Sequence, residues 1–294
     1  MKLLPYIPII SCMKAYVPII LSATFILFSC ASTKTIRFRD VAGNPHKFAV
    51  NQNAAFHEFD KKKFVRGEDG KLYYDDDRYV VRHGLDISRH DGKIDWEKVR
   101  AQGYDFIIFR VAYRGYQSGI LHEDENFREN IVGALAAGFD VGAYVFSQAI
   151  NEEEAVEEAE FILDIIKDYN ITLPVVYDPE SIPWEEARTD DIPGEQFTRN
   201  TKIFCELVKE AGYRPMIYAN HLWQAFMFDM EALKEYTFWY ADYEDSPQLP
   251  YDFEFWQYTA KQKVDGIEPE CDADIWILRR TDNDRQESDV KTAG

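Results

Sequence analysis

Two carboxylates stand two residues apart where an apolar segment of the chain ends. Residues 175–177 are followed by Asp178, Pro179 and Glu180. Side chains at positions i and i+2 of a strand share a face, so we expect Asp178 and Glu180 to emerge together at a strand's C-terminal end. Two carboxyl groups in unlike environments can act as acid and base near neutral pH. The pair therefore predicts a catalytic acid with a helper, although a strand that merely ends in a polar loop has the same residues.

The composition opposes one class of partner and favours another. The chain has 294 residues, of which 46% are hydrophobic, enough for a sizeable core. Its net charge of -19 opposes a nucleic-acid partner, because phosphate binding needs basic side chains. Aromatic residues make up 15%, and flat amphipathic rings can stack on the C–H faces of sugars. We expect most of them to fill the core and some to contact a saccharide.

The cysteines suggest neither a metal centre nor a disulfide framework. They occupy positions 12, 30, 205 and 271, without the spacing of a metal site or a stapled fold. Cys205 lies in a helical pattern and Cys271 near a late strand, so we expect two buried thiols, although an exported protein leaves their pairing open. No cofactor is predicted.

The first thirty residues differ from the rest of the chain. Lys14 precedes an apolar segment, residues 17–28, which is too short to cross a membrane comfortably and is typical of a secretory signal. The segment ends in Leu27-Phe28-Ser29-Cys30, which resembles a lipoprotein lipobox and implies removal of residues 1–29 and a lipid on Cys30. Met13 is an alternative start to Met1. An uncleaved anchor is the other interpretation, and both place the remainder outside the cytoplasm.

The remaining sequence divides into three parts. Residues 30–82 are polar with short alternating segments, which predicts a β-rich spacer. Residues 83–279 alternate short apolar strands with amphipathic helices, and residues 280–294 are charged and predicted to be disordered. About eight strands are expected, the first five followed by helices, and this alternation predicts parallel strands that close into an α/β barrel. The predicted helices cover residues 94–100, 126–137, 151–167 and 195–211.

The order of several motifs resembles glycoside hydrolase family 25, the Chalaropsis-type lysozymes. The motifs are Gly84-Leu85-Asp86-Ile87-Ser88, Gly92-Lys93-Ile94-Asp95-Trp96, Gly142-Ala143-Tyr144-Val145-Phe146, Asp178-Pro179-Glu180, Trp239-Tyr240-Ala241-Asp242-Tyr243, Trp256-Gln257-Tyr258 and Asp272-Ala273-Asp274. The resemblance covers roughly residues 84–277. Each motif is weak alone, but the ordered series is specific.

The resemblance implies an irregular TIM-like (βα)5β3 barrel, preceded here by a small β-rich extension. It implies a lysozyme that hydrolyses the β-1,4 bond from N-acetylmuramic acid to N-acetylglucosamine in peptidoglycan, without a cofactor. The family's acid glutamate falls on Glu180 and its partner aspartate on Asp178. The family's first-strand aspartate falls on Asp86 and the last-strand one on Asp272.

The chemistry expected of these four residues is glycosidic bond cleavage. Glu180 would protonate the bridging oxygen, for which burial and like-charged neighbours must keep it protonated near neutral pH. Asp178 could act as nucleophile, as base for water, or as holder of the substrate's acetamido group, and the sequence leaves the three roles open. Candidates for lining a sugar-binding cleft are Tyr144, Tyr218, Trp239, Trp256 and Gln257, although core packing is nearly as plausible for the aromatic ones.

Two further hypotheses stay open from the residues. The four carboxylates with His83 or His90 could hold a metal for phosphoester hydrolysis, since oxygen-rich clusters bind Mg or Ca. Alternatively, the chain could be a wall-binding lipoprotein without turnover.

The negative charge of the chain favours glycan strands that carry few polyanionic polymers. We therefore expect a monomeric lipoprotein of a Gram-negative-type envelope, in the periplasm or at the outer membrane.

Overall fold

A computed structural model describes residues 34–183 and 185–280. The predicted signal peptide, Cys30 and the tail from residue 281 onward lie outside the described residues. No helix within these ranges is long and apolar enough to cross a bilayer. Cys205 and Cys271 are buried free thiols, as the sequence predicts.

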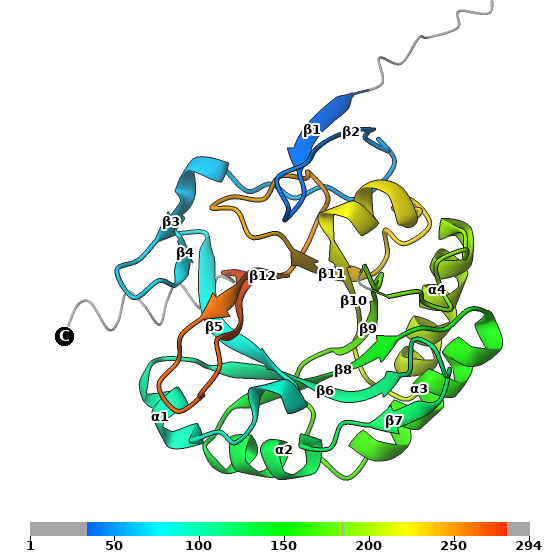
Figure 1. The fold of residues 1–294 in the computed structure, drawn as a ribbon. Coiled ribbons are helices and arrows are strands. Elements are labelled where there is room, and N and C mark those ends of the chain that lie inside the picture. Colours follow the sequence, from blue (N-terminus) through cyan, green and yellow to red (C-terminus); the bar gives the residue numbers. More distant parts are fainter. Residues whose placement is uncertain (1–33, 184, 281–294) are drawn as a thin grey trace, which may run out of the picture. The chain divides into compact units, whose positions relative to one another are not determined.

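Eight strands of the described chain close into a barrel (Figure 1). They are β5 (Tyr79–Ile87), β6 (Phe106–Arg114), β8 (Asp140–Ser147), β9 (Val175–Pro179), β10 (Pro215–Asn220), β11 (Thr237–Ala241), β12 (Phe255–Gln262) and β13 (Cys271–Arg279). Pairing of β5 with β6 closes the ring. The short strand β7 (Leu121–Glu123) pairs antiparallel with the C-terminal end of β6. The prediction of an α/β barrel is confirmed, and β5 begins at Tyr79 rather than at Gly84.

The expectation that all the barrel strands are parallel is wrong for the last one. Strand β13 is antiparallel to both of its neighbours, β12 and β5, whereas the other barrel pairs are parallel. The physical reason is the connection: only residues 263–270 separate β12 from β13, without a helix. A parallel neighbour needs a crossover of about a dozen residues or more, so a connection this short gives a hairpin.

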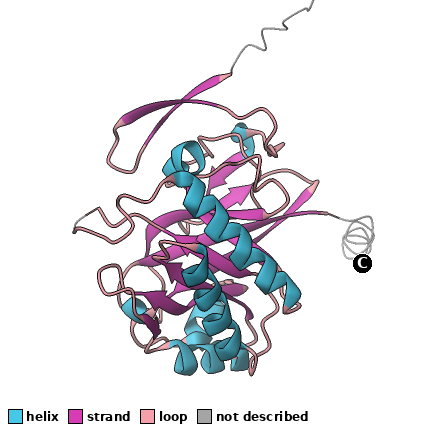
Figure 2. Ribbon diagram, turned by 90° about the vertical axis from the view of Figure 1, so that its right-hand side faces the viewer, coloured by secondary structure: helices cyan, strands magenta, loops and turns pink. Residues whose placement is uncertain are grey.

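Helices cover the outside of the first strands. They are α1 (Trp96–Ala101), α2 (Phe127–Ala136), α3 (Glu152–Ile166) and α4 (Gly194–Glu210), followed by a π-helix, η3 (Trp223–Met227), after β10. Figure 2 shows helices lying in front of the barrel strands. Helix α3 starts where predicted because Asn151 caps it: the Asn151 side chain accepts a hydrogen bond from the Glu154 N–H at 2.9 Å.

Two apolar layers follow from the alternation of side chains along the strands. One layer fills the barrel interior and includes Phe106, Ile108, Val176, Met216 and Phe255. The other lies between the strands and the helices and hairpins outside them. The interior layer is apolar toward one end of the barrel, so the polar residues that share its faces gather at the other end.

Gly84 is required inside the barrel by a close approach of Phe106. A Cβ atom at position 84 would lie 2.2 Å from a ring carbon of Phe106, which itself is fully buried. We therefore expect Gly84→Ala to lower the free energy of unfolding by about 2–3 kcal/mol, because the core must shift to admit one methyl group. Urea unfolding measures this loss, and adding Phe106→Leu should restore part of it. No loss for the single variant would contradict the packing.

The segment before the barrel forms two hairpins. Strands β1 (Thr35–Arg39) and β2 (Pro45–Ala49) pair antiparallel, and a short 3-10 helix, η1 (Lys61–Lys63), leads into β3 (Phe64–Arg66) and β4 (Leu72–Tyr74). Their buried aromatic side chains belong to the same apolar cluster as the outer layer of the barrel. Phe38, for example, packs edge-on against His221, with ring centroids 5.2 Å apart. The hairpins are therefore held against the barrel.

Candidate active site

A polar cleft of about 410 Å³ opens at one end of the barrel. Of the nine residues that the sequence predicts for catalysis or sugar binding in this domain, eight line it. These are Asp86, Tyr144, Asp178, Glu180, Tyr218, Trp239, Gln257 and Asp272. The remaining side chains of its wall include Arg110, Asp91, His90 and Tyr243.

Strand direction explains how distant carboxylates meet in this cleft. Asp178 is the last residue but one of β9, and Asp86 has the same place in β5, so both lie at the C-terminal ends of parallel strands. Asp272 is instead the second residue of β13. Because β13 runs antiparallel, its N-terminal end reaches the same mouth, where Asp272 stands opposite Asp86 in the strand register.

Gln257 connects three of the cleft's polar side chains. Its Nε2 donates a hydrogen bond to Asp86 Oδ2 at 2.6 Å. Its Oε1 accepts from the Tyr218 hydroxyl at 3.1 Å and from the Tyr243 hydroxyl at 2.9 Å. The hydroxyl of Tyr144 donates to the other oxygen of Asp86 at 3.3 Å. Asp86 is therefore held in one orientation by two donors.

Trp239 forms the floor of the cleft. Only 1% of its surface is exposed, and its ring meets those of Tyr144 and Tyr218 edge-on at 5.8 and 5.0 Å. Its Nε1 donates to Asp274 Oδ1 at 2.7 Å, while Asp274 Oδ2 has no hydrogen-bond partner among the described residues. Trp239 therefore packs in the core and lines the cleft as well.

Trp256 does not line the cleft, contrary to the sequence prediction. It is fully buried on the outer side of the barrel, where its ring packs edge-on against Phe64 at 5.1 Å and its Nε1 donates to the Asp242 carbonyl at 2.8 Å. The reason is strand alternation: Gln257 points into the barrel, so the preceding residue points outward.

The two central carboxylates differ in exposure and in bonding. Asp178 is 6% exposed, and its Oδ1 has no hydrogen-bond partner within the described chain. Glu180, two residues on, lies just past the end of β9 and is half-buried. A buried carboxylate oxygen without a partner is costly to folding, so a carboxylate kept at this position in the cleft lining indicates a functional group.

Burial and mutual repulsion raise the pKa values of the whole carboxylate cluster. Burial raises the pKa of Glu180 to about 7, helped by the charge of Asp272, although a hydrogen bond from Tyr218 works against the rise. Burial likewise raises the pKa of Asp272 to about 7, helped by Asp91. The pKa values of Asp86 and Asp178 rise well above the ordinary range, first through burial and then through neighbouring carboxylates. The cluster therefore retains protons near neutral pH, shared among coupled groups.

The backbone of Glu180 is held by Gln148, which directly follows strand β8. The Nε2 of this fully buried amide donates to the Glu180 carbonyl at 2.7 Å and to the Ser147 carbonyl at 3.0 Å. Its Oε1 accepts from the Thr189 hydroxyl at 2.9 Å. All the capacity of the amide except one acceptor lone pair is used, so Gln148 fixes the position from which the Glu180 side chain starts.

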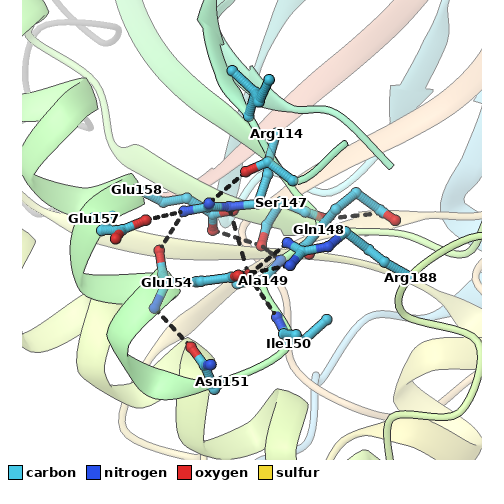
Figure 3. A network of polar contacts seen from close by, with 12 residues as sticks. Arg114, Ser147, Gln148, Ala149, Ile150, Asn151, Glu154, Glu157, Glu158 and Arg188 are labelled. Atoms are coloured by element: carbon cyan, nitrogen blue, oxygen red, sulfur yellow. Dashed lines mark hydrogen bonds and ion pairs between the residues drawn. The ribbon is translucent and has the colours of Figure 1, made fainter. Parts of the chain in front are cut away.

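A larger polar network holds Gln148 in turn (Figure 3). The Gln148 carbonyl accepts from Arg188, whose guanidinium also binds both carboxylate oxygens of Glu154 at 2.6 and 2.7 Å. Buried Arg114 pairs with buried Glu158 at 2.7 Å, and Glu158 accepts a further hydrogen bond from Ser147 at 2.7 Å. The bidentate contact of Arg188 with Glu154 and the buried pair of Arg114 with Glu158 therefore make the loop between β8 and α3 rigid.

The metal hypothesis gains nothing from the arrangement of the side chains. His83 lies on the outward face of β5, edge-on against Tyr73, and does not line the cleft, whereas His90 does. Within the described ranges, no group of three or more histidine, cysteine or acidic side chains is arranged to hold a metal ion.

The sequence matches a known family of enzymes over most of the barrel. The family model described as glycosyl hydrolases family 25 matches residues 85–267. The chain belongs to this family. The matched residues contain all the parallel strands of the barrel after the start of β5, together with Asp86, Asp178 and Glu180, whereas Asp272 follows the matched segment.

Individual relatives agree with the family assignment. The chain is 28% identical over 200 residues to lysozyme M1 of Streptomyces globisporus, covering 64% of this chain and 65% of that protein. It is 25% identical to the modular autolysin LytC of Streptococcus pneumoniae, with a TM-score of 0.59 over 82% of this chain and 56% of that one. A family 25 glycosyl hydrolase from Bacillus anthracis shares the fold at 24% identity and a TM-score of 0.55, over 72% and 94% of the two chains. The chain thus spans slightly less than two thirds of lysozyme M1 and about half of LytC.

Arg110 and Tyr243 are among the cleft-lining side chains that sequence reasoning did not predict. Arg110 lies two residues after the interior residue Ile108, so strand alternation pointed to it. Its pairing with Asp124 at 2.8 Å holds a positive charge beside Asp178. Tyr243 occurs in a quoted motif, but it follows the end of β11, where alternation no longer gives a direction.

Proposed function

We propose that this protein is a peptidoglycan hydrolase of the lysozyme type that cleaves the β-1,4 bond between N-acetylmuramic acid and N-acetylglucosamine. The observation that carries the proposal is the gathering of Asp86, Asp178, Glu180 and Asp272 in one cleft with raised pKa values. Family membership and the names of the relatives, a lysozyme and an autolysin, support it.

The proposed reaction begins with proton transfer from Glu180. As the bond between the anomeric carbon and the bridging oxygen breaks, the Glu180 carboxyl proton moves to that oxygen and the leaving sugar gains a hydroxyl group. Positive charge develops at the anomeric carbon, where the negative charge of the remaining cluster stabilises it. Water then supplies the new hydroxyl group at that carbon. Asp178, which lines the cleft two residues before Glu180, would orient or provide the nucleophile.

Mass spectrometry of a digest tests the bond assignment. Purified peptidoglycan is incubated with the enzyme, and the new reducing ends are reduced with borohydride before analysis. We expect reduced N-acetylmuramic acid at the new ends. Reduced N-acetylglucosamine would contradict the proposed bond, and binding without new reducing ends would favour a wall-binding protein. Full activity after exhaustive chelation would exclude the metal-dependent phosphoesterase alternative.

The pH dependence of turnover follows from the neighbours of Glu180. Because the proposed acid works only while protonated, kcat should fall as the pH rises through about 7, the pKa to which burial raises Glu180. The charge of Asp272 contributes to that rise, so Asp272→Asn should lower the Glu180 pKa and move the alkaline limb to lower pH. Measuring kcat against pH for both proteins checks the shift. A limb that stays in place or moves upward would contradict the arrangement.

Gln148 is expected to act on turnover through Glu180. Gln148→Met keeps the side-chain volume but removes both hydrogen bonds to backbone carbonyls, so we expect kcat to fall about tenfold as the acid loses its position. KM should change little, because Gln148 does not line the cleft. Thr189→Val is the control, since it removes only the hydroxyl that supports the far side of the amide. An equal fall in kcat for both variants would indicate a general loss of packing.

We also propose that a lipid on Cys30 anchors the enzyme in a Gram-negative-type envelope, so that the cleft works on nearby glycan strands. The lipobox-like sequence before Cys30 supports this proposal. Labelled palmitate should be incorporated by the full chain and lost in Cys30→Ser. Incorporation that persists in this variant would remove the assignment.

A further inference from the structure

A second groove, of about 580 Å³, lies between the β1–β2 hairpin and the segment that follows β11. We call it the basic groove, because its lining includes three cationic side chains. Its polar and charged lining consists of Arg37, Arg39, Lys61, Glu244, Asp245, Ser246 and Gln248.

The catalytic cleft and the basic groove are lined by neighbouring residues of one loop. Tyr243 lines the cleft, and the next residue along the chain, Glu244, lines the groove. The loop after β11 therefore contributes one residue to the cleft and the next to the groove, so the two sites share this loop. The tyrosine at this boundary is 42% exposed and is fixed by its hydrogen bond to Gln257.

The groove is locally positive in a chain of net charge -19. Arg37, Arg39 and Lys61 form no ion pair with another described residue. Among the nearby acidic groups, Asp245 is already paired with Arg66 at 3.1 Å. Glu244 and Asp242, whose charge acts on Lys61, partly offset the three cations. Three unpaired cations beside an acidic cleft would attract an anionic group of the substrate.

The walls of the groove are tied together before any ligand arrives. The Gln248 amide accepts from the Arg39 N–H and donates to the Arg39 carbonyl, both at 2.8 Å. The same amide donates to Asp242 at 3.1 Å, next to Tyr243. The hairpin is therefore joined to the loop that carries the cleft tyrosine, and the groove is preorganised, which lowers the cost of binding.

We propose that the basic groove binds the carboxylates of the peptide stem that branches from N-acetylmuramic acid. This inference rests on the proposed function and extends it to the part of the substrate outside the glycan. The stem leaves the sugar through its lactyl ether and carries free carboxylates on its amino acids. An extended stem of four residues spans roughly 14 Å, enough to lead from the cleft along the groove. Arg37, Arg39 and Lys61 would pair with the carboxylates.

Paired substrates test the proposal with the full enzyme. One is purified glycan with intact stems, the second is the same glycan stripped of stems by an amidase, and the third has stem carboxylates blocked as methylamides. We expect kcat/KM of the wild type to be about fivefold higher on intact glycan than on either of the others, as suits two or three exposed ion pairs. The double variant Arg37→Gln/Arg39→Gln should lose this preference while its rate on stripped glycan stays unchanged.

A matched variant separates a local effect from a change in total charge. Lys202→Gln/Lys234→Gln removes two exposed charges that do not line the groove and should keep the preference for intact stems. A double variant at Arg37 and Arg39 that loses rate equally on all three glycans would overturn the proposal, as would a preference that survives blocking of the carboxylates. Equal rates of the wild type on all three would overturn it too.

Direct binding keeps this test apart from that of the proposed function. A free stem tetrapeptide that contains D-glutamate should bind the wild type about fivefold more tightly than the Arg37→Gln/Arg39→Gln variant, with the difference shrinking as salt is added. If no glycan is cleaved but the peptide shows this difference, the proposed function fails and the groove assignment stands. If glycan is cleaved and the peptide shows none, only the groove assignment fails.

Discussion

Replacing Glu180 by glutamine should lower turnover of peptidoglycan about 10³-fold, because an amide cannot donate the proton that the leaving oxygen needs. The isosteric change keeps the backbone of Glu180 and its hydrogen bond from Gln148. It also removes one of several carboxyl groups whose pKa values burial raises, so the folded protein loses a source of repulsion above neutral pH. Release of reducing ends under single-turnover conditions gives the rate.

Thermal unfolding provides the control for Glu180→Gln. The pKa of a carboxyl group can be higher in the folded than in the unfolded state. The free energy of unfolding then decreases as the pH rises through the pKa of the folded state. Above about pH 7 the variant should therefore be as stable as the wild type or more stable. A variant with near-normal turnover would remove Glu180 from the acid role, whereas a large fall in melting temperature would point to damage to the fold.

Replacing Asp178 by asparagine should lower kcat about 10²-fold or more, because the charge or the nucleophilic oxygen at the anomeric carbon is lost. Asp178 lines the cleft, and its buried Oδ1 has no hydrogen-bond partner among the described residues, so no structural contact accounts for this oxygen. Stability should increase, since burial and the charge of Glu180 raise the pKa of Asp178 in the folded state. Initial rates and urea unfolding measure the two effects. A destabilised variant would assign Asp178 a structural role instead.

The configuration of the released sugar then separates the roles open to Asp178. NMR of the fresh product shows inversion if Asp178 activates water directly. Retention follows if Asp178 attacks the anomeric carbon or orients the substrate's acetamido group to do so. Azide should rescue Asp178→Ala if the carboxylate is the nucleophile. These outcomes leave the acid role of Glu180 unaffected, because Glu180 donates its proton in each case.

Local patterns were enough for much of the architecture and for the centre of the site. Apolar strands and capped helices were predicted within a few residues, because side-chain alternation and the Asn151 cap act over neighbouring residues. The same alternation placed Asp178 and Glu180 on one face. Family resemblance contributed Asp86 and Asp272, which no local pattern singles out.

Tertiary pairing decided which of these groups meet. If the last strand were parallel, Asp272 would lie at the far end of the barrel from Asp86. The antiparallel hairpin of β13 with β12 brings Asp272 and Asp86 into register at the same end. Pairing also decided that Gln257 faces the cleft and Trp256 the outer layer. Both faces of a barrel strand are buried, so the sequence of β12 alone does not show which face points inward.

Contacts between distant segments lay beyond any local pattern. Gln148 meets the Glu180 carbonyl across 32 positions of the chain, and Gln248 meets Arg39 across 209. Neither the support of the acid nor the basic groove has a signature in sequence spacing, because both depend on how strands and hairpins pack. Neighbouring residues thus specified the helices, the strands and the carboxylate pair. Long-range packing assembled the cleft, because hydrogen bonding and burial depend on which groups are close in space and not on their separation in the sequence.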